Sequence, residues 1–105
     1  MTERIRQLEK FMEEDSSDPF IRYALALEYV KVDQRTAIDT LEVLMQTSRD
    51  YLPTYYQLAK LYESVGQKEK AENIFSAGIA LAKMQNELKT LRELQAALQE
   101  MEDNS

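Results

Sequence analysis

The chain has no cysteine and no histidine among its 105 residues. Without cysteine it cannot form disulfide bonds, thiolate metal sites or a thiol nucleophile. Without histidine it lacks the commonest metal ligand and the commonest general base at neutral pH. Two glycines and two prolines argue against an all-β fold, because such folds need a turn about every ten residues. The chain is rich in Glu, Lys, Leu, Ala and Gln, which favour helices, and this predicts an all-α protein.

Positive charge is also scarce, since 13 basic and 19 acidic residues give a net charge of −6. This balance disfavours nucleic acid and anionic membranes as partners, because both bind through Lys and Arg. Acidic residues of this kind keep a protein soluble, and attraction of a basic partner is the alternative explanation. No apolar run approaches the roughly 20 residues of a membrane span, and the charged N-terminus lacks the apolar core of a signal peptide. We therefore expect one small cytoplasmic domain over residues 1–105.

Apolar spacing and capping residues predict six helices. Asp18 followed by Pro19, and Asp33, are strong helix start signals. Gly66 suits a tight turn that needs a positive φ. Asn86 is the expected break before the last helix, the alternative being one unbroken helix over 67–101. The expected helices span residues 2–15, 19–31, 34–48, 53–65, 67–83 and 87–101.

Two parts of the chain carry similar residues at a fixed separation. Ala37 and Ala71 are 34 residues apart, and Leu41 and Phe75 have the same separation. A repeat of this length, made of two helix-length halves, indicates a stacked helical array. Such arrays usually bind other proteins.

Residues 52–85 resemble the tetratricopeptide repeat (TPR) family, and residues 19–51 match its pattern less completely. The second copy carries the family's aromatic, small and turn residues at Tyr55, Leu58, Ala59, Tyr62, Gly66, Ala71, Phe75 and Gly78. The first copy matches at Leu25, Ala26, Tyr29, Ala37 and Leu41, and departs from the pattern at Arg22, Asp33 and Leu44. The resemblance implies a short right-handed αα-superhelix of about two hairpins. An N-terminal helix (2–15) and a C-terminal helix (87–101) would cap its ends, because two repeats alone bury too little surface.

Core residues are expected where the two helices of a hairpin cross. Ala59, Ala71 and Gly78 are small enough for a close crossing, while Tyr62 and Phe75 fill the space beside it. Tyr29 and Tyr55 are expected in the core as well. In the N-terminal helix, one stripe of Ile5, Leu8, Phe11 and Met12 is expected to be buried, with Leu8 and Phe11 equivalent to Leu41 and Leu44.

The resemblance also implies a binding groove lined by the first helix of each repeat. Its candidate partner-binding residues are Phe20, Tyr23, Leu27, Val30 and Lys31 in the first copy, and Pro53, Tyr56, Lys60, Glu63 and Ser64 in the second. Tyr23 and Leu27 stand where some members of the family place Lys and Asn to clamp a terminal carboxylate, so that clamp is not expected. Coverage of Phe20, Tyr23 and Leu27 by the N-terminal helix is the alternative to an open groove.

These features predict a non-catalytic adaptor or scaffold that binds a protein or peptide. No catalytic, cofactor-binding or metal-binding residue is identified, because the chain lacks a Gly-rich phosphate loop, a Ca²⁺ loop and an activated nucleophile. Two alternatives stay open: a homodimer formed through the terminal helices or the groove, and an accessory subunit of an enzyme complex. The last helix carries leucines at a 3-4-3 spacing that suits either an end cap or self-association. Any exposed part of Leu88, Leu91 or Leu98 is a candidate homodimer patch.

Overall fold

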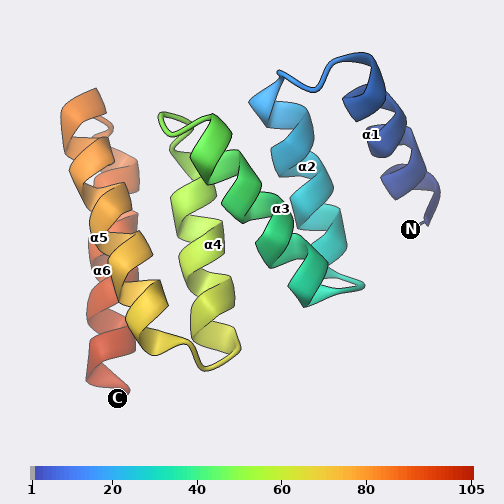
Figure 1. The fold of residues 1–105 in the computed structure, drawn as a ribbon. Helices are drawn as coiled ribbons and strands as arrows, with labels where there is room; N and C mark the ends of the chain where they lie inside the picture. Colours follow the sequence, from blue (N-terminus) through green and yellow to red (C-terminus); the bar gives the residue numbers. More distant parts are fainter. Residues whose placement is uncertain (1) are drawn as a thin grey trace. The chain divides into compact units, whose positions relative to one another are not determined.

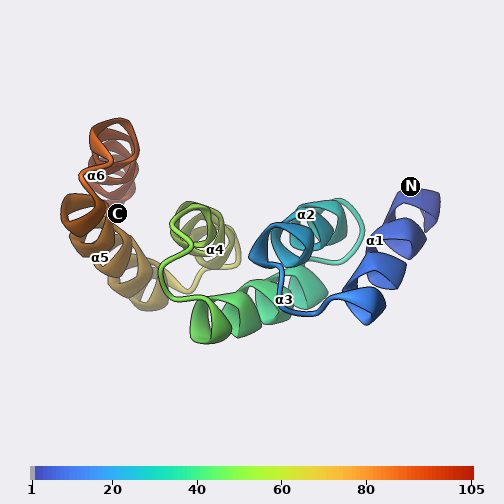
Figure 2. The same ribbon diagram turned by 90° about the horizontal axis from the view of Figure 1, so that it is seen from above.

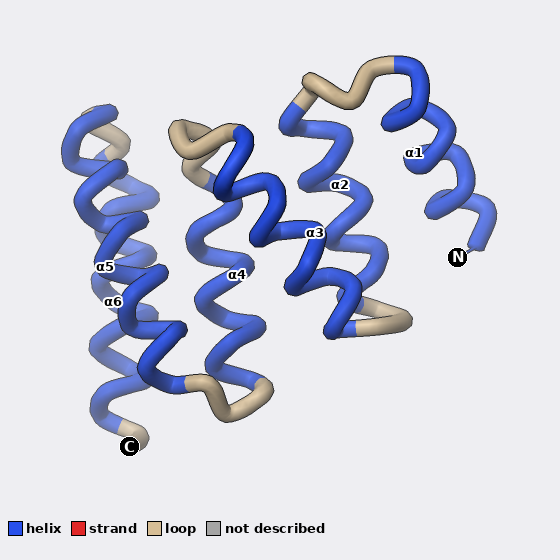
Figure 3. The backbone as a smooth tube through the Cα atoms, viewed as in Figure 1, coloured by secondary structure: helices blue, strands red, loops and turns tan. Residues whose placement is uncertain are grey.

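The computed structural model describes residues 2–105, except for the side chain of Thr2. Over these residues the chain forms helices joined by short loops and has no strand (Figures 1 and 3). The helices are α1 (Thr2–Glu14), α2 (Pro19–Val30), α3 (Gln34–Thr47), α4 (Pro53–Ser64), α5 (Lys68–Gln85) and α6 (Leu88–Asp103). The predicted all-α fold is therefore confirmed.

Two aspartates begin helices as the sequence predicts. The Asp18 carboxylate accepts a hydrogen bond from the backbone N–H of Phe20 at 2.9 Å, with Pro19 in the first turn of α2. Asp33 caps α3 by accepting from the backbone N–H of Arg35 at 3.1 Å and from the hydroxyl of Thr36 at 2.7 Å. The bonds from backbone N–H groups satisfy amides that have no partner within the helix. The bonds to Asp33 lower the pKa of its carboxyl group, chiefly through the Thr36 hydroxyl.

The turns after α4 and α5 share one hydrogen-bond pattern although their residues differ. Gly66 has a φ of 82° and Asn86 a φ of 57°. After α4, the N–H of Gln67 donates to the carbonyl of Tyr62 at 2.8 Å; after α5, the N–H of Glu87 donates to the carbonyl of Ala82 at 2.9 Å. Both are Schellman turns, which end a helix with one left-handed residue. The break predicted at Asn86 is confirmed, and the unbroken helix over 67–101 is wrong.

The chain divides into two compact units, Met1–Thr54 and Tyr55–Ser105. In the first unit α2 packs against both α1 and α3 (Figures 1 and 2). Its buried apolar residues include Leu8, Leu25, Ala26, Ala37, Leu41 and Leu44. The prediction that all 105 residues form a single domain stays a prediction.

The N-terminal helix is less buried than its apolar pattern predicts. Leu8 is buried, whereas Phe11 is 49% exposed and Ile5 and Met12 are half-buried. The expectation that Phe11 is buried like Leu44 is therefore wrong. Because α1 lies on the outer side of α2 within its unit, α2 covers only part of its apolar stripe (Figure 2). Tyr29 also differs from the expectation, since it is half-buried and its hydroxyl donates to Glu9 Oε2 at 2.5 Å.

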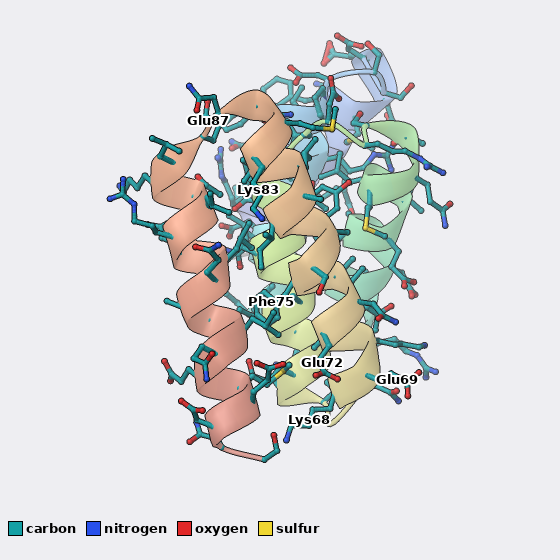
Figure 4. All side chains as sticks on the ribbon, turned by 90° about the vertical axis from the view of Figure 1, so that its left-hand side faces the viewer. Lys68, Glu69, Glu72, Phe75, Lys83 and Glu87 are labelled. Carbon is teal, nitrogen blue, oxygen red and sulfur yellow. The ribbon has the colours of Figure 1, made fainter. Side chains whose placement is uncertain are left out.

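The second unit is built around Phe75, which is completely buried on the inner side of α5 (Figure 4). Its ring and the Tyr56 ring from α4 meet edge to face, with a centroid distance of 6.5 Å. Gly78, one turn further along α5, faces both Tyr55 of α4 and Leu94 of α6. Tyr55 and Tyr62 are buried as predicted, and the Lys70 ammonium lies 5.4 Å from the centre of the Tyr62 ring. Small residues at the crossing therefore allow the close packing that the sequence indicates.

Candidate protein-interaction surfaces

The first candidate surface is the α2 face, made of Phe20, Tyr23, Leu27, Val30 and Lys31. Their spacing places them along one side of the helix. Phe20 is 62% exposed, Lys31 is exposed, and the other three are half-buried. Most of Phe20 is therefore accessible. The alternative that the N-terminal helix covers this residue is wrong.

Tyr23 is positioned by a contact within its own unit. Its ring meets the ring of Tyr51 edge to face, with centroids 5.7 Å apart. Such a geometry is favourable between aromatic rings. Burial raises the pKa of the Tyr51 hydroxyl, with smaller contributions from Tyr23 and Asp18. Tyr51 lies between α3 and α4, and no periodic pattern in the sequence could have linked it to Tyr23.

The second candidate surface is the α4 face, made of Tyr56, Lys60, Glu63 and Ser64. Tyr56 and Glu63 are half-buried, while Lys60 and Ser64 are exposed. Ser64 donates to the carbonyl of Leu61 at 2.7 Å, which occupies its hydroxyl proton within the helix. Pro53, also predicted for the groove, is exposed in the first turn of the same helix.

Each of the two surface lysines is paired with a glutamate three residues away in the chain. Lys31 Nζ lies 3.2 Å from Glu28 Oε2, and Lys60 Nζ lies 3.3 Å from Glu63 Oε1. The second contact is an ion pair without hydrogen-bond geometry. In both pairs the ammonium group is exposed while the glutamate is half-buried, so each lysine can also contact a charge on a ligand. Glu28 was not among the predicted site residues, although its position three residues before Lys31 is the signal that could have identified it.

The chemistry of both surfaces suits protein contacts. Their apolar and aromatic atoms can bury area, and their charges are locally balanced. Across residues 2–105 there is no group of three or more acidic side chains that could hold a metal ion. Among the same residues, none of the helices combines the length and the hydropathy that a membrane crossing requires.

Comparison with solved structures finds a crystal and a solution structure of a tetratricopeptide repeat domain protein from Salinibacter ruber. Both are 40% identical to this chain, with TM-scores of 0.79 and 0.82. The first alignment covers 84% of this chain and 99% of that chain, and the second covers 87% and 93%. A solution structure of a protein from Bordetella parapertussis has a TM-score of 0.83 at 19% identity, over 95% of this chain and 88% of that one, and shows the shared fold alone.

No protein-family model matches the chain, and no curated protein matches it either. The structural similarity nevertheless confirms the helical repeat fold predicted from the sequence. At 40% identity over nearly the whole of the Salinibacter ruber domain, the chain belongs to the tetratricopeptide repeat family.

Proposed function

We propose that the protein is a non-catalytic adaptor or scaffold module that binds a segment of another protein. Membership of the tetratricopeptide repeat family supports a general protein-interaction module. In this proposal the α2 face of the first unit and the α4 face of the second unit are each a contact surface in their own right. The observation that carries this proposal is Phe20, a large apolar side chain that is 62% exposed beside the half-buried Tyr23 and Leu27.

Preorganised aromatic side chains favour this use of the two faces. Tyr23 rests against Tyr51, and Tyr56 rests against Phe75. A ring already held by a neighbour loses little rotamer freedom when a ligand covers it. Phe20 adds apolar area that a ligand can bury, and aromatic anchors of this kind dominate many interfaces.

The paired lysines contribute selectivity in this proposal. A carboxylate on the ligand would contact Lys31 beside Glu28, or Lys60 beside Glu63, because the lysine of each pair is exposed. Charges at the edge of an interface act mainly on the association rate and on the choice of partner. The ligand is therefore expected to present apolar side chains with acidic residues beside them.

Affinity capture from cells, followed by mass spectrometry, tests the proposal with two matched variants. Phe20→Asp removes the exposed ring, and Val43→Asp makes a similar change at an exposed apolar position of α3. Both substitutions are at exposed sites, so both variants are expected to fold. Proteins captured by wild type and by Val43→Asp, but lost with Phe20→Asp, are the expected result.

The captured partner then allows a direct measurement of affinity. Truncation of an exposed aromatic anchor is expected to weaken binding by about tenfold or more, as is usual for a hot spot. Hydrogen exchange should slow in α2 and α4 when the partner is bound. Equal binding by wild type and Phe20→Asp, with no protection of α2, would remove the α2 face from consideration.

A further inference from the structure

Helix α6 carries two parallel stripes at helical spacing: one is apolar and buried, and the other carries three leucines, none of which is buried. Leu94, Ala97 and Met101 form the buried stripe, and Leu94 reaches Gly78 on α5. The second stripe is shifted by one residue and follows a 3-4-3-4 spacing. We call it the outer stripe; it consists of Leu88, Leu91, Gln95, Leu98 and Glu102.

The outer stripe is accessible along its whole length. Leu88 is 52% exposed, Leu91 and Leu98 are half-buried, and Gln95 and Glu102 are exposed. Packing within the second unit therefore leaves these leucines partly uncovered. A 3-4 spacing is the one with which two helices pack side by side in a coiled coil.

We infer that the outer stripe binds the outer stripe of a second copy of this chain, with the two α6 helices antiparallel. The distribution of charge along α6 supports this occupant. Near its start Arg92 borders the outer stripe, whereas Glu93 is turned away from it by helical spacing; at its end Glu102 lies within the stripe. An antiparallel pair places Arg92 of each copy beside Glu102 of the other. A parallel pair would place Glu102 beside Glu102.

The pattern is self-complementary, as a two-fold interface requires, because both charged ends belong to one helix. Opposed helix dipoles favour the same orientation. The polar Gln95 lies between the leucines of the stripe, where a single polar residue commonly fixes the register of paired helices. A stripe of this length spans only about 20 Å of helix, so the dimer is weak and forms at about 100 μM to 1 mM.

The inference is independent of the proposed function, since the outer stripe shares no residue with the α2 face or the α4 face. The dimer can form even if no partner is captured, and a partner can be captured even if no dimer forms. The two proposals are therefore tested by separate measurements on separate variants.

Sedimentation equilibrium from about 10 μM to 1 mM gives the first test. Arg92→Glu places two glutamates of opposite copies together, and Glu102→Arg places two arginines together. Each variant is expected to weaken the dimer by about three- to tenfold. The variant with both changes restores the opposite charges and should return to wild-type association. Both residues are exposed, so the fold is retained. A chain that stays monomeric at about 1 mM, or a double variant no better than the single ones, would overturn the inference.

The absence of cysteine allows a second test by cross-linking. Gln95→Cys places a thiol near the centre of the stripe, and Glu102→Cys places one at its end. With a short thiol cross-linker, Gln95→Cys should give dimers, whereas two antiparallel positions 102 are about 20 Å apart and should not. Ser76→Cys, at an exposed site on α5, gives the background from random collision. Equal cross-linking at positions 95 and 76 argues against the interface, and efficient cross-linking at 102 argues against the antiparallel orientation.

Discussion

A Cβ atom placed on Gly78 would lie 2.8 Å from the Cβ atom of Tyr55. Because the Tyr55 Cβ is attached directly to the backbone of α4, no side-chain rotation can relieve this contact. The approach of the two helices therefore depends on the missing side chain at position 78.

Gly78→Ala should destabilise the protein although alanine is the better helix former. The preference of a helix for alanine contributes about 1 kcal/mol in favour of the variant. Overpacking of this kind costs about 1–3 kcal/mol. Because the added methyl group would contact both Tyr55 and Leu94, we expect a cost at the upper end of this range. We expect a net loss of about 1–2 kcal/mol in urea unfolding. Ser76→Ala, at an exposed position of the same helix, is the control, and a Gly78→Ala variant as stable as wild type would contradict the prediction.

Gly66→Ala should also destabilise the protein, for a different reason. No atom lies within 4 Å of the Cβ that alanine would add, but the residue has a φ of 82°. A left-handed backbone costs an alanine about 1–2 kcal/mol. Thermal and urea unfolding should therefore show a loss of about 1 kcal/mol, and Gly66→Asn should lose less because asparagine tolerates this conformation.

Asn86→Gly is expected to stabilise the protein by roughly 0.5 kcal/mol, because glycine adopts the φ of 57° without strain. Asn86→Ala should act in the opposite direction. The two variants are compared by urea unfolding under identical conditions. If both changed stability in the same direction, strain at position 86 would not be the cause.

Tyr29 links α2 to α1 through its bond to Glu9. The free energy of unfolding that this bond contributes should be largest at neutral pH. Tyr29→Phe removes the hydrogen bond to Glu9 and should cost about 1 kcal/mol. Burial, and then the bond to Glu9, raise the pKa of Tyr29 from 10.0 to about 12. A raised pKa means that this stabilisation is fully present below pH 10 and is lost as the pH rises through about 12.

The difference in unfolding free energy between wild type and Tyr29→Phe should therefore shrink over that alkaline interval. Comparing the two proteins cancels the titration of other groups. Glu9→Gln should lower the pKa of Tyr29 only in part, because burial is the larger cause. Ultraviolet titration of tyrosinate measures this pKa directly. A difference that is constant from pH 9 to 12 would contradict the assignment.

Asp33 should make the stability of the protein depend on pH in the acidic range. Its pKa is lowered by hydrogen bonds from Thr36, so its contribution is present above the ordinary carboxyl range and is lost as the pH falls through the lower folded value. Asp33→Asn keeps an oxygen that can cap α3 but cannot titrate in this range. The variant should therefore unfold with a weaker dependence on pH between about 5 and 2. Thermal unfolding over this range is the measurement, and parallel curves for the two proteins would exclude Asp33 as the titrating group.

The sequence predicted the helices well because their signals are local. Asp18, Asp33 and Gly66 begin or end helices through bonds to residues close in the chain, and such signals are visible in the sequence. The crossing of α4 and α5 was also predictable, since Gly78 and Phe75 stand in the repeat pattern.

The remaining errors come from contacts that no local pattern records. Phe11 was expected to be buried because it follows Leu8 at helical spacing, yet burial depends on whether another helix covers that side. The contacts of Tyr29 with Glu9, and of Tyr23 with Tyr51, join residues far apart in the chain. Of the candidate surfaces, the helical spacing was predictable from the sequence, but the exposure of Phe20 and the support of Tyr23 were not.

The turn at Asn86 shows that two successive helices of this chain can be joined without glycine. It closes α5 onto α6 with the same bonds that Gly66 provides between α4 and α5. Any signature that demands glycine at this point overlooks the later hairpin. In this chain such a signature would run α5 and α6 together into one helix, although Asn86 separates them.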